Sequence, residues 1–166
     1  GVVNLQARDS INASATVTDR INAASTNSYA SLYSMDGGPI RLGTVNAAST
    51  VFLDATYGLV QAAGGSIGAP NVSINNYSDT GQVGSALAPL MLASATPTRL
   101  TMSGLYAPAF VALDATTELS GLSLSGSVAG IGGLSLTGGA NISDWSFGAT
   151  GDVLHVSGAA SQNFGN

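Results

Sequence analysis

Residues 90–136 read LMLASATPTRLTMSGLYAPAFVALDATTELSGLSLSGSVAGIGGLSL, and one short motif recurs through this stretch. The motif places an apolar residue on either side of a variable one, as LML, LTM, VAL, LSL and LSL, beginning at residues 90, 100, 111, 122 and 134. Because successive side chains of a β-strand point to opposite faces, the motif predicts brief strands with one apolar face. The starts lie 10 to 12 residues apart, a spacing that any proposed fold has to explain.

The same motif occurs in the rest of the chain, as IRL at 40–42, VFL at 51–53, VSI at 72–74 and LHV at 154–156. Gly, Asn, Asp or Ser follows most of these tracts, as expected where strands end in turns. Helices are not expected, because Gly interrupts nearly every window after Gly37. Residues 12–30 are rich in Ala but also in Ser, Thr and Asn, which favour turns over helix. The sequence therefore predicts an all-β chain.

Internal repeats favour stacked coils over a sandwich or barrel, which can also show strands every 8 to 12 residues. NAAST at residues 22–26 recurs at 46–50, and LDAT at 53–56 recurs 60 residues later at 113–116. GLSLSG at 121–126 is followed by GLSLTG at 133–138. We interpret the 60-residue offset as three coils of about 20 residues, with chance similarity in a low-complexity chain as the alternative. The prediction is a parallel β-helix over residues 1–166, with 1–35 an irregular or capping region.

Charge and cysteine content limit the possible functions. Only 8% of the residues are charged, against about 25% in average soluble domains. The net charge is −5, with four Arg and no Lys, so no basic cluster exists to neutralise phosphates, and nucleic acid is not expected as a partner. The absence of cysteine excludes a disulfide scaffold but not secretion, because the core of a repeat array grows with each coil.

Membrane-spanning and targeting segments are not expected either. No apolar run approaches the roughly 18 residues that a membrane-spanning helix needs. The first residues lack a basic segment followed by an apolar core, so no signal peptide is recognised. A start at Gly1 without Met fits a fragment excised from a longer protein.

Several tracts resemble the repeats of filamentous haemagglutinin-like exoproteins. The residues that carry the resemblance are IGAP at 67–70, VGSALAPL at 83–90, DGGPIRL at 36–42 and STVFLDA at 49–55. The resemblance covers about residues 36–138, and its motifs are degenerate. It implies a right-handed parallel β-helix, secreted by a two-partner pathway through an outer-membrane transporter. The chain lacks that family's secretion domain and any toxin-like tail, so it would be a middle segment of the rod.

The function implied by this resemblance is adhesion at the bacterial cell surface, a virulence-associated role. The partner would be a receptor or glycan on a host or neighbouring cell. Autotransporter passengers share the architecture and are an alternative. A second alternative is a polysaccharide-binding or polysaccharide-degrading β-helix, such as a lyase or a tailspike-like protein. An ice-binding solenoid would need a regular Thr ladder, which the sequence does not show.

No catalytic residue, cofactor or metal site is predicted. His155 is the only histidine and should face solvent or a groove, without the partners that a triad or a zinc site needs. Asp54 and Asp114 follow apparently equivalent strands, about three coils or 14 Å apart, which is too far for a glycosidase pair. We interpret both as turn residues. The glycine-rich segments 64–68 and 130–133 have no following Lys or helix, so they are interpreted as turns rather than phosphate loops. No calcium-binding motif is present.

Three aromatic residues are the candidate ligand contacts. Trp145, Phe147 and Tyr106 could line a carbohydrate-binding surface, because aromatic rings are enriched at interfaces. The competing interpretation is that Trp145 and Phe147, two positions apart, fill or cap the core near one end of the coil stack. The sequence favours this second interpretation.

Overall fold

The computed structural model shows a parallel β-solenoid, without helix in the part of the chain that the structure describes. That part comprises residues 39–54, 58–76, 81–104 and 107–125, together with strands at 2–7, 11–12, 21–23, 29–34, 133–137, 145–147 and 154–157. The predicted fold class is therefore confirmed. One coil measures about 21 residues, as between Val51 and its register partner Val72, close to the predicted 20.

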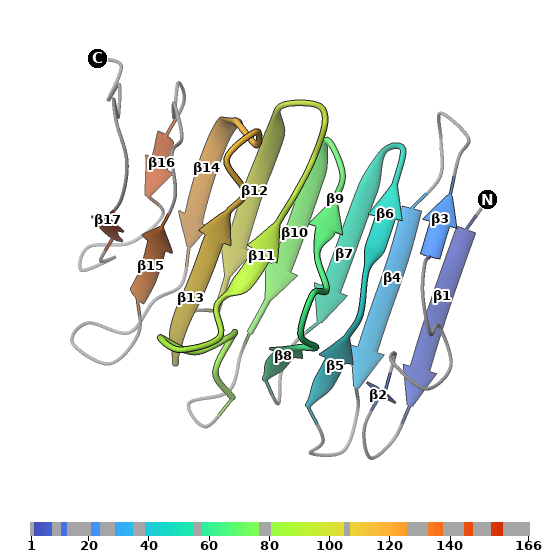
Figure 1. The fold of residues 1–166 in the computed structure, drawn as a ribbon. Helices are drawn as coiled ribbons and strands as arrows, with labels where there is room; N and C mark the ends of the chain where they lie inside the picture. The colour runs from blue at the N-terminus through green and yellow to red at the C-terminus, as the bar shows by residue number, and fades with distance from the viewer. Residues whose placement is uncertain are drawn as a thin grey trace.

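Two parallel sheets of seven strands form the facing layers of the solenoid (Figure 1). In spatial order, sheet A contains β1 (Val2–Ala7), β4 (Tyr29–Ser34), β7 (Thr50–Asp54), β10 (Asn71–Asn75), β12 (Thr98–Ser103), β14 (Leu119–Ser125) and β16 (Trp145–Phe147). Sheet B contains β3 (Ile21–Ala23), β6 (Val45–Ala47), β9 (Ile67–Gly68), β11 (Leu90–Leu92), β13 (Pro108–Leu113), β15 (Gly133–Thr137) and β17 (Leu154–Ser157). The strands of the two layers run in opposite directions, as a winding chain requires.

A third sheet closes the solenoid along one side. This sheet C contains β2 (Ile11–Asn12), β5 (Ile40–Leu42) and β8 (Leu59–Gln61). Single parallel bridges extend it from Leu59 to Val83 and from Val83 to Ala109. Ala109 belongs to β13, the strand whose later residues pair with β11 of sheet B. Each coil therefore supplies two or three short strands.

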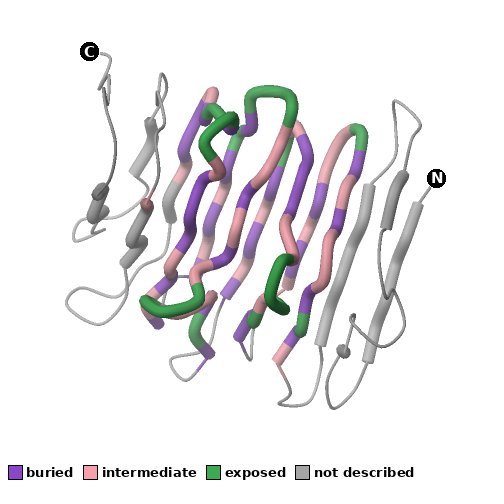
Figure 2. The backbone as a smooth tube through the Cα atoms, in the orientation of Figure 1, coloured by how far each residue is buried: buried purple, intermediate pink, exposed green. Residues whose placement is uncertain are grey.

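The dry interior consists of columns of apolar side chains that repeat from coil to coil. Val51, Val72, Leu100 and Leu122 are consecutive register partners in sheet A, and each is at most 3% exposed. In sheet B, Val45 pairs with Ile67, and Ile67 pairs with Leu92, again all buried. Figure 2 shows buried and partly exposed positions alternating along the described strands. In-register stacking thus buries one face of the strands whose side chains the structure describes, from β5 to β13.

All nine apolar–variable–apolar tracts are strands, and the 10 to 12 residue spacing has a simple origin. The tracts beginning at 90, 111 and 134 lie in sheet B, whereas those at 100 and 122 lie in sheet A. Successive tracts therefore alternate between the two layers, and each spacing is half a coil. The first NAAST repeat is confirmed as a coil period, because Asn22 pairs with Asn46 in the adjacent coil.

One repeat assignment is wrong. Leu53 of the first LDAT tract lies in β7 of sheet A, whereas Leu113 of the second lies in β13 of sheet B. The 60-residue offset is therefore not a whole number of coils. The GLSLSG and GLSLTG tracts likewise lie in β14 of sheet A and β15 of sheet B. Both layers need the same alternating pattern, so similar sequences arise on opposite faces.

Candidate functional site

A hollow of about 860 Å³ lies on the outer surface of sheet B. It lies where the chain passes from β8 of sheet C to β9 of sheet B through a loop of five residues. Strand β8 ends at Gln61 and β9 begins at Ile67, with residues 62–66 (AAGGS) looping between them. The amide of Ala62 donates to Leu42 O at 2.7 Å, and that of Gly65 donates to Ala62 O at 2.9 Å. These bonds hold the loop in a tight turn and leave a gap in the strand ladder.

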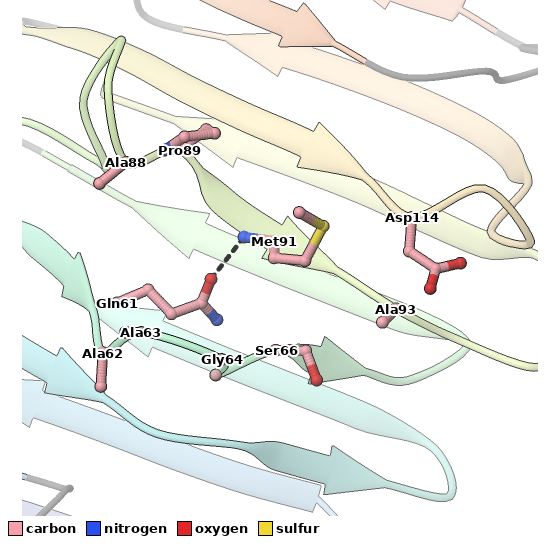
Figure 3. A pocket seen from close by; sticks show the side chains of 11 residues that line it. Gln61, Ala62, Ala63, Gly64, Ser66, Ala88, Pro89, Met91, Ala93 and Asp114 are labelled. Carbon is pink, nitrogen blue, oxygen red and sulfur yellow. Dashed lines mark hydrogen bonds between the residues drawn. The ribbon is translucent and has the colours of Figure 1, made fainter.

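Gln61 closes the ladder at this gap with its side chain (Figure 3). In the next coil, the backbone N–H groups of Met91 and Ala93 point to the same edge of β11, because they are two residues apart. Ala93 N donates to the backbone oxygen of Ile67 at 2.8 Å. Met91 N instead donates to Gln61 Oε1 at 2.5 Å. The side-chain oxygen of Gln61 thus takes the place of a backbone carbonyl.

The other half of the Gln61 carboxamide has no partner. Among the described residues, Gln61 Nε2 is the one buried side-chain polar atom that makes no hydrogen bond. The bond from Met91 N fixes the amide orientation, because a backbone N–H needs the oxygen and not the nitrogen as its acceptor. Two N–H donors are therefore left at the edge of the hollow. Buried donors of this kind are rare in folded proteins.

Asp114 lies at the opposite side of the hollow, beyond Met91, directly after β13 ends at Leu113 (Figure 3). Its Oδ1 accepts hydrogen bonds from Thr116 N at 2.7 Å and from Thr116 Oγ1 at 2.6 Å. These bonds, first that from the Thr116 hydroxyl, lower the pKa of the Asp114 carboxyl below its ordinary value. Thr117 N also donates to Asp114 O at 3.1 Å, which confirms Asp114 as a turn residue.

The rest of the lining is apolar or small. Met91 and Pro89 are half-buried, whereas Ala62, Ala63 and Ala88 are exposed. A mostly apolar hollow with a few convergent polar groups is the usual form of a small-molecule site, and pockets of about 300–1,000 Å³ are typical. The arrangement can donate one or two hydrogen bonds at one side and accept them at the other.

A smaller hollow of about 360 Å³ lies at the corner between sheets B and A. Two of its polar residues bond to each other, since Ser94 Oγ lies 3.3 Å from both the amide nitrogen and the hydroxyl oxygen of Thr96. Asn46, with a larger amide group, is the other polar side chain among the described residues of its lining. Besides that amide, this hollow offers a ligand little beyond small side chains.

The side chains of the three predicted aromatic contacts are not among those that the structure describes. Tyr106 lies outside the described residues, as do the side chains of Trp145 and Phe147. The backbone of β16 pairs Trp145 with Leu122 and Phe147 with Leu124 of β14. The backbone of His155 pairs with Ser135 in sheet B, and its side chain is likewise outside the described residues.

The two aspartates do not form a stacked pair. Asp54 ends β7 in sheet A and Asp114 follows β13 in sheet B, so the predicted equivalence of their strands is wrong. Within the described ranges, no group of three His, Cys, Asp or Glu side chains could hold a metal ion. No helix in those ranges is long and apolar enough to cross a membrane.

Comparison with known proteins adds no relative. No family model, no curated protein and no solved structure matches the chain. The chain is therefore placed by its own geometry, as a parallel β-solenoid.

Proposed function

We propose that this chain is a structural and adhesive rod segment of a secreted bacterial surface protein, which mediates attachment or display. The observation that carries the proposal is the in-register stacking of parallel coils, which places β1 and β16 at opposite ends of sheet A. Each coil adds about 4.8 Å along the axis, so the fold acts as a spacer. Such a spacer carries a binding surface away from the cell that exports it.

The described outer face of sheet A suits an adhesive role because it is largely polar, although it also includes Phe52 and the charged residues Asp54 and Arg99. Ser73, Thr101 and Ser123 are consecutive register partners there, and all three are partly exposed. Ser103 Oγ donates to Asn75 Oδ1 in the preceding coil, which orders the polar groups along the face. Ordered hydroxyl and amide groups can exchange hydrogen bonds with a polar partner without a large desolvation cost.

The family proposed is the filamentous haemagglutinin-like exoproteins, with export through an outer-membrane transporter. The support is the set of sequence tracts that resemble its repeats. Two of them, IRL at 40–42 and VFL at 51–53, are strands β5 and β7 of one coil. The partner would be a receptor or glycan on a host or neighbouring cell, and the proposed role needs no catalysis.

An adhesion assay tests this function directly. Beads coated with the chain should adhere to cultured epithelial cells or to bacterial cells more than beads coated with albumin. Soluble chain in excess should displace them. Adhesion no greater than that of the albumin beads on both cell types would contradict the proposal.

A further inference from the structure

We propose that the hollow between Gln61 and Asp114 is a binding subsite for a neutral saccharide. In this subsite Gln61 Nε2 donates to an oxygen of the sugar, Asp114 accepts from a sugar hydroxyl, and Met91 packs against the ring. The inference rests on the proposed adhesive function, for which it names a ligand class and a place. We call this hollow the saccharide subsite.

The donor side follows from the unpartnered amide of Gln61. Its Nε2 is buried and has no hydrogen-bond acceptor, while its Oε1 is committed to Met91 N at 2.5 Å. The amide therefore cannot rotate to satisfy Nε2 without releasing the backbone of β11. A buried donor without a partner is unfavourable, and an oxygen supplied from the hollow removes that penalty.

The acceptor side is the Asp114 carboxylate. Thr116 occupies Oδ1 twice, but an ionised carboxylate offers about four lone-pair positions. The carboxylate can therefore also accept from a ligand hydroxyl. The saccharide subsite thus combines a donor and an acceptor, and a sugar hydroxyl can satisfy either one.

Charge selects a neutral sugar over an acidic one. Asp114 carries a negative charge, the chain as a whole carries −5 and has no Lys, and no Arg is among the described residues that line the hollow. An anionic saccharide would meet repulsion without a compensating cation. The apolar C–H face of a neutral ring can lie against the flexible Met91 side chain and Pro89.

The same geometry argues for binding rather than cleavage at this place. Asp114 is the one carboxylate among the described residues that line the hollow. Hydrolysis of a glycosidic bond ordinarily uses two carboxyl groups about 5 to 9.5 Å apart. The saccharide subsite supplies one, so the bound sugar is held and not cut.

Titration of the full chain followed by NMR tests the subsite. The probes are cellotriose and N,N′,N″-triacetylchitotriose as neutral trisaccharides, and trigalacturonate as the acidic one. At least one neutral probe should shift the Gln61 side-chain amide and Met91 backbone amide resonances, with a dissociation constant on the order of 1 mM or below. Trigalacturonate should leave both resonances in place. Unmoved resonances with both neutral probes, or equal shifts with trigalacturonate, would overturn the inference.

Two matched variants separate the ligand contact from the fold. Gln61→Glu keeps an oxygen for Met91 N but loses the Nε2 donor, and Asp114→Asn keeps an oxygen for Thr116 but loses the charge. Each should weaken binding of the neutral probe at least about tenfold, with an unchanged circular dichroism spectrum. Gln82→Glu, the same substitution at an exposed glutamine outside the hollow, should bind as the parent does. Parental affinity in both subsite variants would refute the subsite.

The adhesion assay then distinguishes the two proposals. If the parent chain adheres and the Gln61→Glu and Asp114→Asn variants adhere equally well, the saccharide subsite is wrong as the adhesive contact and the proposed function stands. If the parent chain binds the trisaccharide but its beads do not adhere, the proposed function is wrong and the subsite stands.

Discussion

At the scale of single residues, two glycines with similar backbone angles differ in the space around them. Gly84 has φ +64° and Gly64 has φ +75°, a region that side chains with a Cβ adopt at a cost. A Cβ on Gly84 would lie 2.6 Å from Phe110 O and 2.8 Å from Leu90 N, because the next coil passes directly over it. A Cβ on Gly64 would meet no atom within 4 Å.

Alanine at these two glycines should therefore have unequal effects. In Gly64→Ala only the positive φ is unfavourable, so this variant should lower the free energy of unfolding by about 1–2 kcal/mol. Gly84→Ala adds a collision with the backbone of two other segments, and overpacking of this kind costs a further ~1–3 kcal/mol. Urea denaturation of both variants measures the difference. Equal destabilisation would show that the coils do not approach each other at Gly84.

Asp114 provides a second prediction at this scale, through pH. Because the pKa of its carboxyl is lowered in the folded chain, its stabilising hydrogen bonds are present above the ordinary aspartate pKa. They are lost as the pH falls through the lowered value. Carboxyl ¹³C NMR should show Asp114 titrating below an unperturbed aspartate. Thr116→Val should raise that pKa, because the hydrogen bond from the Thr116 hydroxyl is the largest cause of its lowering. An unchanged titration of Asp114 in this variant would contradict the Thr116 contact.

At the scale of elements, buried hydroxyls join the corners of adjacent coils. Thr98 opens β12 and is 1% exposed, and its Oγ1 donates to Ala69 O of the preceding coil at 2.8 Å. Thr117 is also buried, and its Oγ1 accepts from Ser94 N at 2.9 Å. The turns between sheets B and A are thus bonded to the coils on either side. These bonds satisfy backbone groups where the strand ladder stops.

Removal of one such hydroxyl should be costly. Thr98→Val keeps the shape of the side chain but leaves Ala69 O without its buried donor, which should destabilise the chain by about 1–3 kcal/mol. Thr101→Val, on the outer face of the same strand, should change stability by less than about 0.5 kcal/mol. Thermal denaturation of both variants compares them. A Thr98 effect as small as that of Thr101 would remove the corner bond from the account.

Predictability from sequence differs between elements. Strands with two large apolar residues flanking a variable one, such as β10 and β12, could be predicted, because their alternation matches the two faces of a strand. Strands such as β6 (Val45–Ala47) and β9 (Ile67–Gly68) could not be predicted, because each contains one large apolar residue and otherwise only small or polar ones. Their position depends on the coils above and below them.

The candidate site was not predictable in the same way. The aromatic residues drew attention because of their chemistry, whereas the hollow is made by a Gln, a Met and a loop of Ala and Gly. Gln61 gains its role only because β8 and β9 are separated by a turn. The one signal in the sequence is the polar Gln at the end of a strand, followed by AAGGS, which is weak by itself.

At the scale of the whole molecule, stability depends on repetition of coils around one continuous apolar interior. Val72 contacts its register partners on both sides, Val51 and Leu100, and the same holds for Ile74 between Leu53 and Met102. Each coil buries apolar surface of the coils next to it, so the stability of the stack is approximately a sum of contributions from neighbouring coils. The outer faces are then free to vary in polar residues, which is where the saccharide subsite and the outer face of sheet A lie.

Parallel, in-register stacking is the central claim, and engineered disulfides test it most directly because the chain has no cysteine of its own. Ser73 and Thr101 are direct register partners on the outer face of sheet A, whereas Ser73 and Ser103 are offset by two residues. Partners about 4.8 Å apart can be bridged, but diagonal positions, at about 7–8 Å, lie beyond the usual disulfide span.

The double variant Ser73→Cys/Thr101→Cys should therefore oxidise rapidly to an intramolecular disulfide in the folded chain. Ser73→Cys/Ser103→Cys should remain reduced under the same conditions. Mass spectrometry of the oxidised, alkylated proteins reads out both. Efficient bridging of the second pair, or of neither, would contradict the stacked-coil structure on which the rod, the hollow and its ligand all depend.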